Sequence, residues 1–339
     1  MIVGIVGASG YTAGELIRLL CIHPEVEIVW VTSRRFVGKP LSSVHPNLRG
    51  FTDLRFRGYS HEMIKDCDVV FLCLPHHASM DFVKDMFGGV KIIDLSADFR
   101  IKNPEIYAQY YSEHSCPDLL SKAVYGMPEL HREEIKNAEL VANPGCISTS
   151  VILGMHPLVQ NLDSLRVTVD VKIGSSAAGR GASLSTTHAE RCGVVRSYQP
   201  ANHRHLAEIE QELGLQNVGI TCHAVDMVRG VLSTCHVFPE KLPTMKDLRE
   251  IYRKCYGNEP FVRVVVRKNP PYNLPDVKTV IYSNFCEIGF VIDDHANRLV
   301  IFSAIDNLIK GSAGQAIQNL NLMFGLDETT GLKTPGFYL

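Results

Sequence analysis

Two patterns of apolar and polar positions divide the chain at about residue 146. In the first part, short runs rich in β-branched residues alternate with amphipathic stretches at helical spacing. The runs predict strands at residues 2–6, 26–32, 68–74, 90–95 and 138–142. Because these strands are almost continuously apolar, we expect a parallel sheet with helices on both faces, the doubly wound α/β architecture.

The second part has longer runs that alternate apolar and polar residues. These predict strands at residues 165–173, 218–225, 231–238, 261–266, 280–292 and 298–305. We expect an α+β domain with a mostly antiparallel sheet at 147–305. The sequence Asp306-Asn307-Leu308 opens a last helix through about Phe324, capped by Gly325. We expect residues 306–339 to pack back on the first domain, 1–146.

Charge and cysteine usage exclude several classes of protein. The 339 residues carry a formal charge of -2, so no basic field is available for nucleic acid or an anionic membrane. A strand-like run begins at Ile2 and no apolar stretch reaches membrane-spanning length, which favours a cytoplasmic protein. The ten cysteines are scattered without Cys-x-x-Cys, which is typical of reduced thiols.

No metal site is expected. The sequences Thr221-Cys222-His223 and Thr234-Cys235-His236 offer two Cys-His pairs on neighbouring strands. Adjacent residues of a strand point to opposite faces, so the two pairs are poorly placed to supply four ligands to one ion.

A glycine-rich turn follows the first predicted strand. Gly7, Ser9 and Gly10 lie between that strand and the helix that begins near Tyr11 and Thr12. Glycines here allow a tight turn and a close approach of a pyrophosphate to the helix N-terminus, the Rossmann-type arrangement. We expect these five residues to bind a dinucleotide; an ordinary strand–helix turn is the alternative.

The second strand ends in Thr32-Ser33-Arg34-Arg35. A cofactor without a 2′-phosphate usually meets an acidic residue at this position, whereas a serine and two arginines suit the phosphate. We therefore expect NADP bound by Ser33, Arg34 and Arg35; a solvated basic loop is the alternative.

The sequence Asn143-Pro144-Gly145-Cys146 joins a strand to an apolar helical run. The free N–H groups at a helix start carry partial positive charge, which stabilises a thiolate. Most cysteines are inert buried hydrophobes. The strand-to-helix context is what singles out Cys146 as the candidate nucleophile.

Two histidines and a glutamate form a second cluster. His203 and His205 are two residues apart, and Glu208 follows His205 by three positions. On a helix this spacing lets the carboxylate hold the imidazole and set its tautomer and pKa. We expect His205 to be the acid/base group with His203 in reserve; satisfied core histidines are the alternative.

Two further segments are open to several readings. Residues 172–181 end a strand in small residues that include Ser176, Gly179 and Arg180, and could bind an anion or line the nicotinamide. A flexible glycine-rich loop explains them about equally well. The sequence Asp94-Leu95-Ser96-Ala97-Asp98-Phe99-Arg100 is also ambiguous, although it ends a parallel strand, where such sheets bind ligands.

At these motifs the chain resembles the N-acetyl-γ-glutamyl-phosphate reductase family over essentially its whole length, from the glycine turn to Asp306-Asn307-Leu308. The resemblance implies that Cys146 is the nucleophile, that His203 or His205 is the base, and that Asn307 touches the cofactor. Ala13 replaces the third glycine of the usual fingerprint, a mild departure that still allows close packing of helix on sheet.

The segment from Thr187 to Tyr198 resembles one branch of that family, whose substrates are attached to an acidic amino-group carrier protein in lysine and arginine synthesis. This implies that Arg191 and Arg196 face the carrier. We expect Asn143 and Arg180 to contact the substrate as well.

The implied function is NADPH-dependent reduction of a carrier-linked γ-glutamyl or δ-aminoadipyl phosphate to its semialdehyde through a cysteine thioester, by a homo-oligomer (a dimer or a tetramer). Two alternatives stay open. One is N-acetyl-γ-glutamyl-phosphate reductase activity on the small acetylated substrate. The other is an NADP-sensing regulator without catalysis, which needs the glycine turn but no activated cysteine.

Overall fold

The computed structural model describes residues 1–265, 270 and 273–338, and it divides into two compact units. Unit 1 comprises Met1–Pro144 and Ser312–Lys333, and unit 2 comprises Gly145–Gly311 and Thr334–Leu339. Residues 306–311 and 334–339 therefore belong to unit 2, whereas we expected all of 306–339 to pack on the first domain. The reason is that the side chains of Asp306 and Asn307 bond to Arg229 and Gly230 of unit 2.

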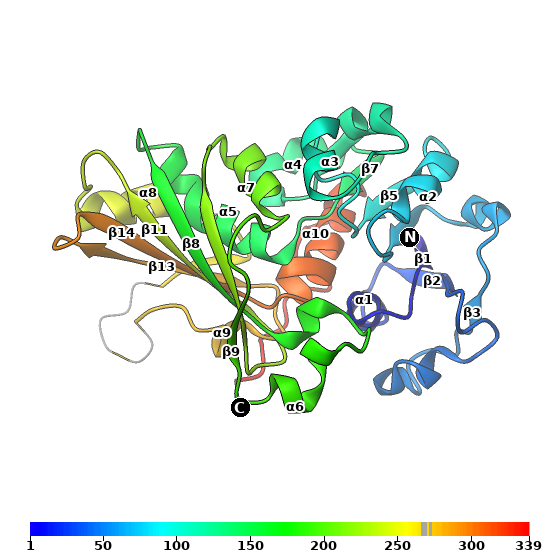
Figure 1. Cartoon of the computed structure of the whole chain (residues 1–339). Coiled ribbons are helices and arrows are strands. Elements are labelled where there is room, and N and C mark those ends of the chain that lie inside the picture. Colours follow the sequence, from blue (N-terminus) through cyan, green and yellow to red (C-terminus); the bar gives the residue numbers. More distant parts are fainter. Residues whose placement is uncertain (266–269, 271–272, 339) are drawn as a thin grey trace. The chain divides into compact units, whose positions relative to one another are not determined.

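Unit 1 is built on a seven-stranded parallel sheet in the order β3-β2-β1-β4-β5-β7-β6 (Figure 1). The order runs outward from β1 in both directions, so the chain changes direction between β1 and β4. This confirms the doubly wound class. The strands are β1 (Ile2–Val6), β2 (Glu27–Thr32), β3 (Phe56–Arg57), β4 (Val69–Leu72), β5 (Lys91–Asp94), β6 (Ala123–Tyr125) and β7 (Leu140–Ala142).

Helices complete unit 1, and the last of them comes from the C-terminal segment. The helices are α1 (Tyr11–Leu20), α2 (Ser79–Met86), α3 (Pro104–Tyr110), α4 (Pro128–Lys136) and α10 (Gly314–Met323). Helix α10 packs against α1, α4 and β5. It is buried despite its amides, because Gln315 and Asn319 both donate to the carbonyl of Gly126 at 2.9 Å.

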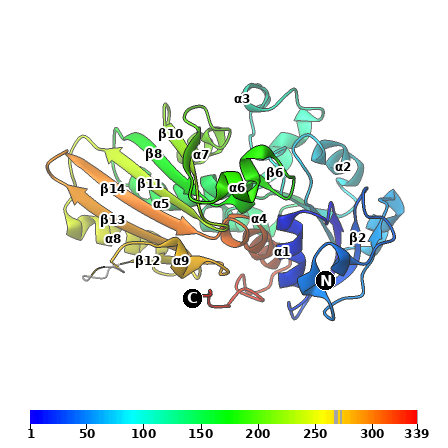
Figure 2. The same cartoon turned by 60° about the horizontal axis from the view of Figure 1, so that its bottom comes forward.

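Unit 2 carries a second seven-stranded sheet in the order β12-β13-β14-β11-β8-β10-β9 (Figures 1 and 2). Only the β12–β13 and β8–β10 pairings are parallel, so the sheet is mostly antiparallel, as predicted. The strands are β8 (Arg166–Ile173), β9 (Val195–Gln199), β10 (Gly219–Val225), β11 (Val231–Phe238), β12 (Val262–Val264), β13 (Cys286–Asp293) and β14 (Arg298–Ile305).

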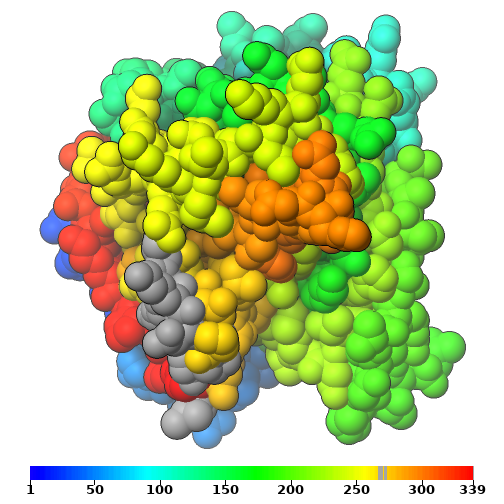
Figure 3. Space-filling view, turned by 90° about the vertical axis from the view of Figure 1, so that its left-hand side faces the viewer, coloured from blue at the N-terminus to red at the C-terminus, as the bar shows by residue number. Residues whose placement is uncertain are grey.

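One face of this sheet is covered by helices. Helix α5 (Cys146–Val159) packs against β11, β13, β14, α7 (Leu206–Leu213) and α8 (Met245–Tyr256). Two buried tyrosines of α8 fix the pair of helices, because the hydroxyls of Tyr252 and Tyr256 donate to the carbonyls of Gly154 and Leu153 at 2.6 and 2.7 Å. Figure 3 shows α8 (yellow) beside the turn between β13 and β14 (orange).

Several predicted elements differ from the structure. The predicted strand 280–292 begins only at Cys286, because α9 (Val277–Val280) and a turn with Tyr282 at φ +64° precede it. The predicted strand 261–266 is β12, and residue 266 lies outside the described residues. The short strands β3 and β6 were missed, as was β9, whose residues are mostly exposed and give no alternating pattern.

The last helix also differs from its prediction, since a π-helix at Ile309–Ala313 precedes α10; α6 (His188–Arg191) is a single turn. Gly325 after α10 has φ +69°, a conformation suited to the predicted glycine cap. Among the described residues, no helix combines the length and the apolar composition that crossing a membrane requires.

Two glycines of unit 2 should respond to alanine in opposite ways. A Cβ at Gly154, inside α5, would meet Ser303 at 3.4 Å and Ile301 at 3.6 Å, which is ordinary van der Waals contact. We expect Gly154→Ala to raise the free energy of unfolding by about 0.5–1 kcal/mol through helix propensity. At Gly311 a Cβ would lie 2.6 Å from the Cβ of Cys146, so Gly311→Ala should destabilise. Urea unfolding followed by circular dichroism measures both, and a destabilised Gly154→Ala would contradict this packing.

Candidate active site

Cys146 is the first residue of α5, and Gly145 is its N-cap in an extended conformation (φ -73°, ψ 147°). The side chain is half-buried. The first N–H groups of α5 have no partners within the helix, so their partial positive charge lies beside the sulfur. The backbone of Gly311 packs so closely on Cys146 that any larger residue there would collide with it.

Glu208 connects the residue before Cys146 to the cluster of two histidines, His203 and His205. This carboxylate is 1% exposed, and its Oε2 accepts a hydrogen bond from the N–H of Gly145 at 3.0 Å. Its other oxygen, Oε1, lies 4.0 Å from Nε2 of His205. One buried acid therefore contacts both the residue before the candidate nucleophile and the candidate acid/base imidazole, a connection that the sequence spacing alone did not reveal.

His203 and His205 are both buried and their rings pack edge to face at 4.8 Å. His205 is the N-cap of α7. His203 Nδ1 accepts a hydrogen bond from the N–H of His205 at 3.1 Å. Burial, with a smaller contribution from Arg204, lowers the pKa of His203 to about 4. His203 is therefore neutral and weakly basic near neutral pH.

Tyr198 is a member of this cluster that sequence reasoning missed. Its ring lies 6.3 Å from that of His203, edge to face. Burial raises the pKa of Tyr198, with smaller contributions from the nearby thiol groups of Cys222 and Cys146. Tyr198 lies in β9, whose exposed residues gave no strand pattern, so the sequence offered no signal for it.

The glycine turn of unit 1 has the geometry that a dinucleotide requires. Gly7 has φ +79°, and a Cβ there would lie 2.5 Å from the carbonyl oxygen of Cys73. Ser9 is inside the turn, where its N–H donates to the carbonyl of Gly7 at 2.9 Å. Gly10 is the N-cap of α1, and no heavy atom lies within 4 Å of a Cβ placed on it. The start of α1, with Tyr11 exposed and Thr12 half-buried, thus faces open space that suits a pyrophosphate.

The residues after β2 lie at the carboxyl edge of the same sheet. Ser33 is buried and its N–H donates to the carbonyl of Arg57 at 3.1 Å. Arg34 and Arg35 are exposed, and the guanidinium of Arg35 lies 5.3 Å from the centre of the Phe36 ring. Both arginines are therefore accessible to a ligand.

Asn143 does not present its side chain for substrate binding as predicted. It is 1% exposed, and its Nδ2 donates to the carbonyl of Ser312 at 3.0 Å. Its Oδ1 accepts from Nδ2 of Asn319 at 3.2 Å. The amide is used inside unit 1 to hold the C-terminal segment.

Asn307 and Ser176 are likewise engaged with each other. Asn307 Nδ2 donates to Ser176 Oγ at 2.9 Å, and Asn307 Oδ1 accepts from the N–H of Gly230 at 2.7 Å. Gly179 has φ +79° and, like Arg180, is exposed. Asn307 thus holds the loop in which Gly179 and Arg180 are accessible.

The two arginines of the segment 187–198 have different environments. Arg191 is partly buried, and its Nη2 donates to the carbonyl of Ile173 at the end of β8 at 2.8 Å. Burial lowers the pKa of Arg191. Arg196 is exposed, with Glu190 of the same segment 3.5 Å away. Arg191 is therefore poorly placed to face a partner as predicted, whereas Arg196 is accessible.

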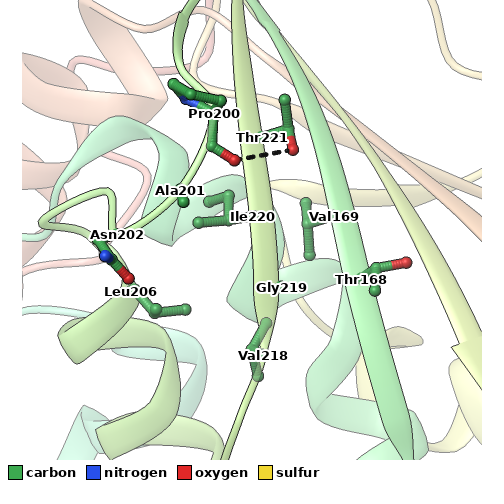
Figure 4. Close-up of a pocket in the computed structure, with 10 residues that line it drawn as sticks. All are labelled: Thr168, Val169, Pro200, Ala201, Asn202, Leu206, Val218, Gly219, Ile220 and Thr221. Carbon is green, nitrogen blue, oxygen red and sulfur yellow. Dashed lines mark hydrogen bonds between the residues drawn. The ribbon is translucent and has the colours of Figure 1, made fainter.

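A cavity of about 240 Å³ lies between β8, β10 and the turn Pro200–Asn202 that leads to the histidines (Figure 4). The hydroxyl of Thr221 donates to the carbonyl of Pro200 across one side of it at 3.3 Å. All ten lining residues are uncharged, so this cavity offers no acid, base or nucleophile.

No group of three or more metal-binding side chains occurs in the part of the chain that the structure describes. Cys222 and Cys235 are buried, whereas His223 and His236 are on the more open side of their strands. All ten cysteines are free thiols.

Comparison with known proteins identifies the family. Residues 2–138 match the model of the semialdehyde dehydrogenase NAD binding domain, and residues 146–307 match that of the semialdehyde dehydrogenase dimerisation domain. The chain is 52% identical to a protein of Cenarchaeum symbiosum, over 98% of each chain, and 52% identical to one of Pyrococcus furiosus, over 97% and 96%. Both are named as LysW-L-2-aminoadipate/LysW-L-glutamate phosphate reductases.

A relative from Thermomicrobium roseum, 48% identical over 99% and 98% of the two chains, is named as a LysW-L-2-aminoadipate 6-phosphate reductase. Among solved structures, aspartate semialdehyde dehydrogenase II of Vibrio cholerae shares the fold, with a TM-score of 0.72, 16% identity and coverage of 96% and 98%. The paired domains and the full-length relatives agree, and the chain belongs to the semialdehyde dehydrogenase family of nicotinamide-dependent oxidoreductases.

Proposed function

We propose that this enzyme reduces a γ-glutamyl or δ-aminoadipyl phosphate, attached to an acidic amino-group carrier protein, to the semialdehyde with NADPH. The observation that carries the chemistry is the buried Glu208, which contacts both the N–H of Gly145 and the imidazole of His205. The names of relatives about half identical to the chain support the carrier-linked substrate.

The first step belongs to Cys146. Its thiolate attacks the acyl carbon of the acyl phosphate and forms a thioester, while the bond from that carbon to the phosphate oxygen breaks and inorganic phosphate leaves. The N-terminus of α5 stabilises the attacking thiolate. One difficult reduction of a carboxylate is thereby replaced by two easier steps.

The second step requires a proton as well as a hydride. When bound, the nicotinamide cofactor supplies the hydride for the thioester carbonyl. His205 donates a proton to the developing oxyanion and takes it back as the C–S bond breaks, which releases the aldehyde and restores the thiolate. Glu208, whose Oε1 lies 4.0 Å from Nε2 of His205, positions the imidazole for this proton transfer.

The glycine turn and the exposed arginines after β2 support NADPH as the cofactor. The turn leaves open space at the start of α1 for the pyrophosphate, and Arg34 and Arg35 can pair with a 2′-phosphate. Gly179 and Arg180, exposed in the loop that Asn307 holds, are candidates for further contacts with cofactor or substrate.

We also propose that the enzyme is a homo-oligomer, either a dimer or a tetramer. The match of residues 146–307 to a dimerisation domain supports this. The polar residues of β8, such as Asp170 and Lys172, lie on a half-exposed face of the sheet that a second copy can cover.

The acid/base assignment predicts unequal effects of two matched substitutions. Asparagine removes the imidazole at either position and, at residue 203, can replace the Nδ1 atom that accepts from the N–H of His205. We expect His205→Asn to lower kcat/KM by about 10²–10⁴-fold. The pKa of His203 is lowered to about 4, so His203 takes up a proton only in acid and His203→Asn should keep the pH profile near neutrality. Profiles of kcat/KM from pH 5 to 9 measure this; a larger loss in His203→Asn would assign the role to His203.

Cofactor choice depends on two exposed arginines. Each charged contact to the 2′-phosphate is worth roughly 1.5–3 kcal/mol. We expect Arg34→Ala with Arg35→Ala to remove most of the preference for NADPH over NADH while kcat changes little. Lys65→Ala is the control, since it removes an exposed cation before β4, at the opposite edge of the sheet. Equal kcat/KM for NADPH and NADH in the wild-type enzyme would refute NADP specificity.

The carrier-linked substrate predicts a specific dependence on salt. Exposed charges on the enzyme attract the oppositely charged carrier and speed its association, and salt screens this attraction. We therefore expect kcat/KM for a carrier-linked substrate to fall as the salt concentration rises. Arg196→Ala should lower the same kcat/KM several-fold. The small N-acetylated substrate should show neither effect. Arg249→Ala, an exposed arginine on α8, is the control. If N-acetylglutamyl phosphate is reduced at least as efficiently as the carrier-linked form, the small-substrate alternative is correct.

A further inference from the structure

We infer that Asp98 is a positioning residue for cofactor binding: it holds the turn His76–Ser79 as the second wall of the crevice whose first wall is the glycine turn. The inference rests on the proposed cofactor site. In a doubly wound sheet, ligands bind outside the carboxyl ends of the strands where the strand order reverses. Here that point lies between β1 and β4.

The segment after β4 lies directly against the glycine turn. The N–H of Cys73 donates to the carbonyl of Val6 at 2.9 Å. A Cβ on Gly7 would come within 2.5 Å of the carbonyl oxygen of Cys73 and within 2.9 Å of the side chain of Leu74. The glycine turn therefore has this segment as its neighbour at the carboxyl ends of β1 and β4.

Asp98 holds the turn His76–Ser79, which directly follows that segment in the chain. The carboxylate is fully buried, and Oδ1 accepts from the N–H of His77 at 2.9 Å while Oδ2 accepts from the N–H of Ser79 at 3.1 Å. A third bond comes from the hydroxyl of Tyr107 at 3.0 Å. The N–H of Ala97 donates to Nδ1 of His76 at 3.2 Å, which ties the two loops together a second time.

The backbone of His77 has an unfavourable conformation that other contacts must stabilise. It has φ +70°, in the left-handed region that is unfavourable for a residue with a β-carbon. Its side chain is exposed; it bonds to the hydroxyl of Ser112 at 3.0 Å, and its ring lies 6.2 Å from that of Tyr111. Burial of the side chain therefore does not explain the backbone conformation. The two hydrogen bonds to Asp98, on the N–H groups of residues 77 and 79, do explain it.

The test is NADPH affinity, measured by cofactor fluorescence in the full-length enzyme. Asparagine is isosteric with aspartate but turns an N–H toward one of the two backbone donors. We expect Asp98→Asn to raise the Kd of NADPH at least 10-fold. Glycine adopts positive φ without strain, so adding His77→Gly to Asp98→Asn should recover part of the lost affinity for NADPH. If Asp98 only stabilised the fold, the substitution at residue 77 would not restore cofactor binding.

Asp327→Asn is the matched control, because Asp327 also accepts hydrogen bonds from a nearby backbone N–H and hydroxyl, both of Thr329, but lies after α10. It should leave the Kd unchanged. The rate of Cys146 alkylation reports the integrity of unit 2 in every variant. An unchanged Kd in Asp98→Asn overturns the inference, whereas a wild-type enzyme that binds neither NADPH nor NADH overturns the proposed cofactor site itself.

Hydrogen exchange on the wild-type enzyme gives an answer even if Asp98→Asn fails to fold. Without cofactor, the amides of His77 and Ser79 should already exchange at least 100-fold more slowly than an unstructured peptide, because Asp98 binds them. Exchange at the rate of an unstructured peptide, with protection appearing only when NADPH is added, would show that the cofactor and not Asp98 orders the turn.

Discussion

The chemistry that we propose for this enzyme depends on one buried carboxylate. Glu208 is almost fully removed from water, and an isolated charge there would be costly unless hydrogen bonds and a neighbouring positive charge offset the cost. The N–H of Gly145 supplies one such hydrogen bond, and Nε2 of His205 lies 4.0 Å from the other carboxylate oxygen. The arrangement connects the start of α5 to the start of α7, so that the proposed nucleophile and the proposed acid/base group keep a fixed geometry.

The two histidines of the cluster differ in their distance from this carboxylate and in their surroundings. His203 lies in the same buried cluster, but it has no carboxylate among the groups that shift its pKa, and burial dominates. His205 differs in having the carboxylate of Glu208 4.0 Å from its Nε2. Two residues of the same type, two positions apart, thus have different surroundings.

The sequence predicted those parts of the structure that local rules determine. The apolar strands gave the doubly wound sheet, the glycine turn gave the start of α1, and the strand-to-helix junction placed Cys146 at the first residue of α5. The i, i+3 spacing brought Glu208 to His205, but its bond to Gly145 spans 63 residues and has no local signature. Long-range contacts of this kind decide a site and cannot be inferred from periodicity.

Residues whose side chains are used internally show the same limit. Asn143 and Asn307 belong to recognisable motifs, yet the amide of Asn143 holds Ser312 and that of Asn307 holds Ser176 and Gly230. Arg191 resembles Arg196 in sequence, but it turns inward to the carbonyl of Ile173. The residue types indicated that these asparagine and arginine side chains form polar contacts. Only the three-dimensional structure showed that Asn143, Asn307 and Arg191 have partners within the protein itself.

The most direct test of the account is to look for the acyl-enzyme. The enzyme would be mixed with acyl phosphate in the absence of nicotinamide cofactor, quenched in acid, digested and analysed by mass spectrometry. We expect an acyl group on the peptide that contains Cys146, in the wild-type enzyme and in His205→Asn, and none in Cys146→Ser. An acyl group on a different residue, or substantial turnover by a folded Cys146→Ser variant, would contradict it.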